Sequence, residues 1–163
     1  MAIQEKSATI RFVAMPSDKA RAYQSGTADE NGQEPEVHIS DGEGNPCRHC
    51  LKYVAKDEQV LLLSYRPFHR KRPFAETGPI FLHANSCERA IESDVVPEVL
   101  EGRDSILIRG YDVDERIIYG TGEIVSSQAL KAQCLKLFEQ PDVAYIHVRS
   151  ATNNCYSCRI ERG

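Results

Sequence analysis

The chain has 163 residues, of which 41% are hydrophobic, and its formal net charge is −4. This length and composition predict one globular domain over residues 1–163 that buries a core without disulfide or metal staples. The acidic balance argues against a nucleic-acid-binding surface, which needs a basic excess. No apolar run approaches the roughly 20 residues of a membrane helix.

The polar start of the chain, Met1 to Lys6, lacks the apolar segment of a secretory signal. We therefore expect a cytoplasmic protein. In that compartment the six cysteines are thiols or metal ligands rather than disulfides.

The first half of the chain alternates short strands with polar loops. Apolar residues that alternate or run continuously predict strands over 9–14, 37–39, 60–65 and 79–84. A short helix is expected from about Pro16 to Gln24, and residues 25–46 form a polar loop region by composition. Two prolines place residues 66–77 in a loop with four basic side chains.

The second half contains a hairpin, one clear helix and two more strands. Residues 106–111 and 116–125 predict the hairpin. The helix is expected over 127–139, with Ser126 or Ser127 as its cap and one apolar stripe that includes Leu130 and Cys134. Strands over 143–149 and 155–161 follow. The predicted fold is a single α+β domain: a mostly antiparallel sheet of about seven strands with one main helix packed on it.

The sequence contains two Cys-x-x-Cys elements, one at Cys47 and Cys50 and the other at Cys155 and Cys158. This spacing raises a zinc or thiol-redox hypothesis. Residues i and i+3 of a strand point to opposite faces, so the expected last strand separates Cys155 from Cys158. The Pro and Gly residues before Cys47 allow a turn that brings it close to Cys50. From this pattern we expect no metal and no cofactor. A zinc site made of Cys47, Cys50, Cys155 and Cys158 remains the alternative.

Polar residues inside expected strands form a second candidate site. In the strand 143–149, His147 and Arg149 share one face, which either binds a polar ligand or is a solvated outer face. Arg109 lies inside an apolar run, where its charge needs a partner: a ligand, or an acid such as Glu76, Glu123 or Asp112. The candidate ligand-binding residues are Arg48, His83, Arg109, His147, Arg149 and Cys155.

Several segments together resemble an uncharacterised bacterial family, the domain of unknown function 1203. They include Pro46-Cys47-Arg48, the run from Leu61 to Phe68, Gly78 to Phe81 and Arg109 to Asp112. The resemblance continues through Val143 to Arg149 and Cys155-Tyr156, and covers residues 10–162. It implies a soluble protein of one domain with no assigned activity. It also implies that cysteine is typical at Cys47 and Cys155 but not at Cys50 and Cys158, so that a four-cysteine zinc site is not a family property.

Three functions stay open at this point. The favoured one is a domain that binds, or acts on, a small polar or anionic ligand in an Arg/His/Cys-lined pocket. A cysteine-based zinc or thiol-redox module is the first alternative. A protein-interaction domain without chemistry, with the basic loop 66–72 as a candidate surface, is the second. The sequence has no Gly-x-Ser-x-Gly, no Walker loop, no Gly-x-Gly-x-x-Gly after a strand and no His-Glu-x-x-His. No nucleic acid or membrane partner is expected.

Overall fold

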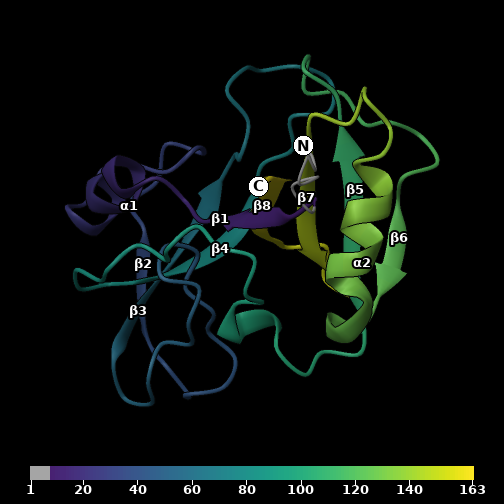
Figure 1. Cartoon of the computed structure of the whole chain (residues 1–163). Coiled ribbons are helices and arrows are strands. Elements are labelled where there is room, and N and C mark those ends of the chain that lie inside the picture. The colour runs from purple at the N-terminus through teal and green to yellow at the C-terminus, as the bar shows by residue number, and fades with distance from the viewer. Residues whose placement is uncertain (1–7) are drawn as a thin grey trace, which may run out of the picture.

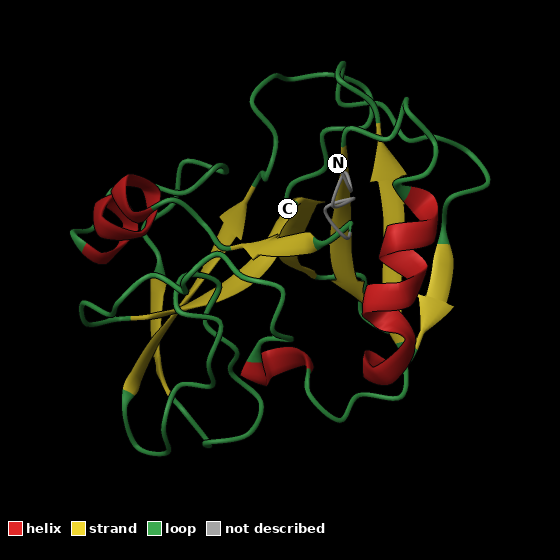
Figure 2. Cartoon of the chain, viewed as in Figure 1, coloured by secondary structure: helices red, strands yellow, loops and turns green. Residues whose placement is uncertain are grey.

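The structure is a computed structural model that describes residues 8–163, so the polar start Met1–Lys6 lies outside the described residues. Its elements are, in chain order, β1 (Ile10–Val13), α1 (Ser17–Gln24), β2 (Glu36–Ile39), β3 (Gln59–Tyr65), β4 (Gly78–His83), the 3-10 turn η1 (Glu98–Leu100), β5 (Ile106–Tyr111), β6 (Glu123–Val125), α2 (Ser127–Leu137), β7 (Tyr145–Ser150) and β8 (Tyr156–Arg162). Figure 2 shows how much loop separates these elements.

The strands form two antiparallel sheets rather than the one sheet expected. The larger sheet has the order β1-β8-β7-β5-β6, and the smaller has the order β2-β3-β4. The two sheets lie on opposite sides of the molecule in Figure 1, with α1 beyond the smaller sheet and α2 against the larger. The α+β class and the antiparallel pairing are as predicted, and the described part of the chain contains eight strands and two α-helices.

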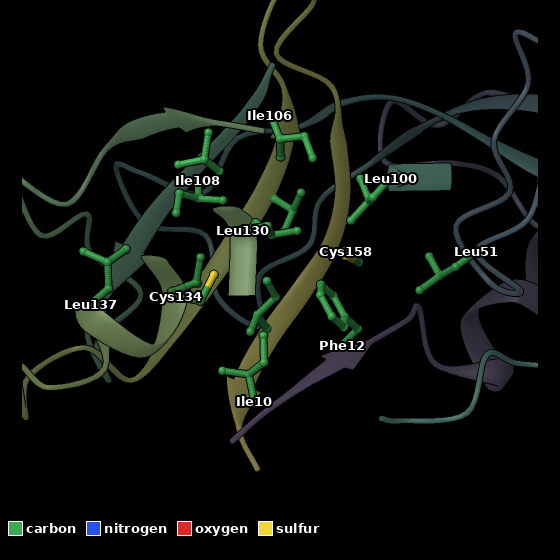
Figure 3. Close-up of a cluster of buried hydrophobic side chains, with 14 of the residues drawn as sticks. Ile10, Phe12, Leu51, Leu100, Ile106, Ile108, Leu130, Cys134, Leu137 and Cys158 are labelled. Carbon is green, nitrogen blue, oxygen red and sulfur yellow. The ribbon is translucent and has the colours of Figure 1, made fainter. Parts of the chain in front are cut away.

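The predicted main helix packs on one face of the larger sheet. Leu130, Cys134 and Leu137 face a cluster that includes Ile106 and Ile108 of β5, as Figure 3 shows. The Ser126 hydroxyl accepts a hydrogen bond from the Ala129 backbone N–H, as expected for an N-cap. Helix periodicity therefore predicted both the element and the face that it buries.

The opposite face of the larger sheet is also buried, so it is not a solvated outer face. Tyr145, His147 and Arg149 of β7 are at most 4% exposed. Phe68, from the loop between β3 and β4, packs against Tyr111 and Tyr145 over this face. The loop between β3 and β4 therefore covers this face of the sheet. The alternating pattern of β7 could not show this, because the covering residues lie far away in the sequence.

A β-bulge changes the predicted face pattern of β8. The register with β7 shifts between Val148 and Arg149, so that Tyr156 pairs with Arg149. Cys158 lies in the core beneath α2. Tyr156, however, lies with His147 on the opposite face, with ring centroids 4.9 Å apart.

The predicted hairpin is shorter than expected. Within the predicted second arm, residues 116–125, the part that pairs with β5 as a strand is β6, and Ile117 makes an isolated bridge to Tyr111. The Thr121 hydroxyl accepts a hydrogen bond from the Gly110 N–H at 2.9 Å, and so takes the place of a ladder carbonyl. Among the described residues, no helix combines the length and apolar character of a membrane span.

Candidate functional site

A tight turn brings Cys47 and Cys50 together and fixes them beside β4. The Cys47 N–H donates to the Lys52 carbonyl at 2.9 Å, and the Leu51 N–H donates to the Cys47 carbonyl at 3.0 Å. Leu51 has φ +56°, the left-handed conformation that closes such a turn. The Arg48 N–H donates to the Phe81 carbonyl at 3.1 Å, which docks the turn on β4.

Four potential metal ligands converge at this point. Sulfur or nitrogen atoms of Cys47, Cys50, His83 and Cys87 all lie within 4.8 Å of one another. His83 is the last residue of β4, and Cys87 lies four positions further on. Since Cys47 is fully buried and the other three are partly buried, the cluster lies just beneath the surface.

The spacing of these atoms fits a tetrahedral zinc ion. Zinc–sulfur bonds of about 2.3 Å separate two sulfur ligands by about 3.8 Å, and a sulfur from a nitrogen ligand by about 3.6 Å. The Cys47 and Cys87 sulfurs are 3.9 Å apart. The Cys50 sulfur and His83 Nδ1 are 3.5 Å apart. Three thiols and one imidazole are a donor set that zinc prefers.

A second layer of polar groups orients the four ligands. His49 Nδ1 lies 3.1 Å from the Cys87 sulfur, and its Nε2 lies 2.8 Å from the Ser17 hydroxyl oxygen. The His83 backbone N–H donates to the Cys47 sulfur at 3.4 Å. His83 Nε2 lies 3.9 Å from a carboxylate oxygen of Glu58. Such partners fix ring orientation and raise ligand basicity around a metal.

The electrostatics of the cluster concentrate negative charge on Cys47. Hydrogen bonds from Cys50 and Cys87 hold the pKa of the Cys47 thiol well below its usual range. The same hydrogen bonding with Cys47 raises the pKa of Cys50, and raises that of Cys87 to about 11. It also raises the pKa of His83. A bound cation would compensate this negative charge and favour all three thiolates.

The structure does not bring the two Cys-x-x-Cys elements together in this cluster. Cys158 is buried in the core beneath α2. Cys155 lies just before β8, where its thiol contacts the Asn153 carbonyl at 3.7 Å. The four-cysteine set is therefore replaced by one that keeps Cys47 and Cys50 and recruits His83 and Cys87.

The six candidate ligand-binding residues divide among different places. His83 belongs to the cluster with Cys47, Cys50 and Cys87. Arg48 is buried and ties the turn to β8, because its Nε donates to the Tyr156 carbonyl at 2.7 Å. Burial lowers the pKa of Arg48 to about 10. The remaining basic residues, Arg109, His147 and Arg149, come together on the covered face of the larger sheet, where Arg109 and His147 are cross-strand partners.

Arg109 has the acidic partner that the sequence left open. Its Nη2 donates to Glu76 at 2.9 Å. Arg149 Nη1 reaches the other oxygen of the same carboxylate at 3.2 Å. Glu76 therefore bridges two arginines on neighbouring strands, and it comes from the loop that covers them.

Cys87 is the functional candidate that sequence reasoning missed. It lies in an irregular segment without the periodicity that would assign it a face. The signal that was present is the spacing His83-x-x-x-Cys87 directly after a strand. A histidine followed at this spacing by another ligand is typical of the second half of a zinc site whose first half is Cys-x-x-Cys, and three cysteines with one histidine are an established donor set for zinc.

Comparison with known proteins adds a family but no activity. The sequence profile of the family described as Protein of unknown function (DUF1203) matches residues 44–162, a segment that includes the turn, all four cluster residues and the bridged arginines. No curated protein and no solved structure matches the chain. Because the match spans well over half of the chain, this protein belongs to the DUF1203 family.

Proposed function

We propose that this protein is a zinc-binding domain whose single metal centre is formed by Cys47, Cys50, His83 and Cys87. The observation that carries the proposal is the convergence of these four ligand atoms within 4.8 Å. Two of their separations, 3.9 Å and 3.5 Å, are close to those of a tetrahedral zinc ion. The expectation that the chain uses no cofactor is revised accordingly.

The number of ligands favours a structural role for this centre. Catalytic zinc sites have three protein ligands and leave a position for water or substrate, whereas structural sites have four. Four side chains of the cluster fill the tetrahedral shell. The metal would then hold together segments that have little regular structure of their own: the turn that carries Cys47 and Cys50, and the loop that carries Cys87.

A thiol-redox module built on the same cysteines is the second candidate. It is favoured by the hydrogen-bond chain from Ser17 through His49 to Cys87, since a histidine oriented by a third group is the usual partner of a reactive thiol. The two candidates differ in one measurable quantity, the amount of metal held by the purified protein.

The test is the metal content of the native protein, purified without chelator and without a metal-affinity column. Elemental mass spectrometry is expected to find about one zinc ion per chain. The variant Cys87→Ser is expected to lose most of this zinc. The matched control Cys155→Ser removes a partly buried cysteine outside the cluster, so it should keep the wild-type content.

Two outcomes would overturn the zinc proposal. One is a wild-type protein with no metal and with all thiols reduced, or with a reversible disulfide within the cluster, which would favour the redox candidate. The other is a loss of zinc in Cys155→Ser as large as that in Cys87→Ser. That result would return the ligand set to the two Cys-x-x-Cys elements.

A further inference from the structure

One edge of the Arg149 guanidinium carries hydrogen-bond donors without acceptors. Its side chain is 4% exposed, and its Nη1 donates to Glu76 and to the Asn154 carbonyl, both at 3.2 Å. Its Nε and Nη2 are buried and have no hydrogen-bond partner among residues 8–163. These two nitrogens form the side-on fork that binds carboxylate and phosphate oxygens in pairs. Buried donors left unpaired in this way call for an additional partner, such as an ion or water.

The charges around Arg149 do not balance. Arg109 and Arg149 share one carboxylate, that of Glu76. The neighbouring Arg159 pairs with Glu161 at 3.0 Å, a carboxylate that it shares with Arg11. The buried Glu115 accepts hydrogen bonds from the backbone N–H groups of His69 and Arg70. Among the described residues, Arg109 and Arg149 therefore have a single carboxylate in direct contact between them, at a site where an unpaired ion is costly.

The pKa of His147 is affected by the same positive charges. Burial, and then the charges of Arg149, Arg159 and Arg109, lower its pKa well below the usual value. Both of its ring nitrogens are buried without a partner in the structure. His147 therefore adds neither a negative charge nor an acceptor to Arg149, and the imbalance remains.

A small pocket opens beside Arg149 and the carboxylate of Glu76. It has a volume of about 190 Å³, and Arg149, Glu76, Thr77 and Asn153 are among its lining residues. Pockets for drug-sized ligands measure roughly 300–1,000 Å³, so this one suits a single small group. Glu76 is 40% exposed while Arg149 is not, which makes the glutamate the partner that can leave.

We propose that Arg109 and Arg149 form a binding site for a dianionic phosphate group, either inorganic phosphate or the phosphoryl end of a small ester. In the ligand-free protein Glu76 occupies part of this site as a tethered carboxylate, at Arg109 Nη2 and Arg149 Nη1, and leaves the Nε and Nη2 edge of Arg149 unpaired. When phosphate displaces it, two guanidinium charges face two negative charges, and the balance that Glu76 leaves incomplete is restored. A monoanion such as acetate cannot restore it. The site is separate from the metal centre and does not depend on it.

The test measures phosphate affinity by calorimetry at constant ionic strength, with the metal content of each sample recorded. The variant Glu76→Gln removes the internal competitor and keeps the shape of its side chain. We expect it to bind inorganic phosphate about tenfold more tightly than the wild type, a factor that corresponds to about 1.4 kcal/mol. Its thermal midpoint should also rise with phosphate but not with acetate.

Glu92→Gln is the matched control, because Glu92 also bridges two arginines, Arg11 at 2.9 Å and Arg89 at 3.5 Å, but in a more exposed pair. It should leave phosphate binding unchanged. Adding Arg149→Lys to Glu76→Gln should abolish the gain in phosphate affinity, because the lysine ammonium lacks the paired N–H donors of a guanidinium.

Three results would contradict the proposal. The first is a Glu76→Gln protein that binds phosphate no more tightly than the wild type. The second is equal gains for phosphate and acetate, which would show a site for any anion. The third is a Glu92→Gln protein with the same gain, which would show a general effect of charge. Because the main variant is expected to gain binding, failure of a variant to fold cannot imitate the expected result. Comparing phosphate with a phosphate monoester on Glu76→Gln then distinguishes the two ligand sources.

Discussion

His147 lies in a cage of four aromatic rings. The ring centroids of Phe68, Tyr111, Tyr145 and Tyr156 are all between 4.7 and 5.1 Å from that of the imidazole. The imidazole is fully buried, and the arginines nearby oppose its protonation. Folding therefore holds this histidine in its neutral form, which gives the protein an acid-sensitive position outside the Cys/His cluster.

The free energy of unfolding should fall as the pH drops below about 6.5, partly because of His147. In the unfolded chain a histidine takes up a proton below that pH, whereas folded His147 has a lowered pKa and stays neutral. The unfolded state then binds more protons, so acid favours unfolding. One such group contributes at most about 1.4 kcal/mol per pH unit.

The variant His147→Phe should reduce this loss of stability between about pH 6.5 and 5, when urea unfolding is followed at several pH values. Phe keeps an aromatic ring in the cage and removes two buried nitrogens that have no partner. The exposed His69→Phe is the control for the loss of a histidine. An unchanged pH dependence in His147→Phe would show that other groups dominate the acid response.

At the scale of the element, α2 depends on its N-cap. The variant Ser126→Ala removes the side-chain acceptor for the Ala129 N–H, a hydrogen bond of 3.2 Å. Loss of such a cap costs about 1 kcal/mol of stability. Ser127→Ala changes the next residue, inside the first turn, where alanine has the higher helix propensity, and it should be neutral or slightly stabilising. Chemical denaturation of the two variants measures the contrast, and equal effects would argue against the cap.

The same helix shows what could be predicted from sequence and why. The apolar stripe and the cap of α2 are local patterns, so its start and its buried face were predicted correctly, although the helix ends at Leu137 rather than at residue 139. The metal cluster is not local, because Cys87 meets Cys47 only through the docking of the turn on β4. The buried face of β7 depends on the loop that carries Phe68. Cross-strand register and remote covering segments leave no periodic signal in the chain.

At the scale of the whole molecule, two large apolar clusters meet at the cysteine-bearing turn. One cluster lies between α2 and the larger sheet, and it includes Leu51 of the turn. The other includes β3 and β4 of the smaller sheet, together with Cys47. Every residue of β2, the edge strand of the smaller sheet, is exposed. The smaller sheet thus has fewer buried apolar side chains than the larger sheet. The proposed zinc ligands Cys47, Cys50 and Cys87 belong to the cluster of the smaller sheet.

Removal of the metal should therefore destabilise the smaller sheet and the cysteine-bearing turn more than the larger sheet and α2. Proteins open locally in units whose stability follows their buried apolar contacts. In hydrogen exchange on the metal-loaded and chelator-treated protein, we expect amides of β3 and β4 and of the turn 45–53 to lose protection. Amides of α2, β5 and β7 should keep most of theirs, because the core beneath α2 contains none of the four proposed ligands. Cys155→Ser, treated in the same way, should respond like the wild type.

Equal loss of protection in both sheets would show that the two apolar clusters unfold as one unit, with the turn as their common support. No loss anywhere would show that the fold does not need the metal, and the closed centre would then lack its structural role.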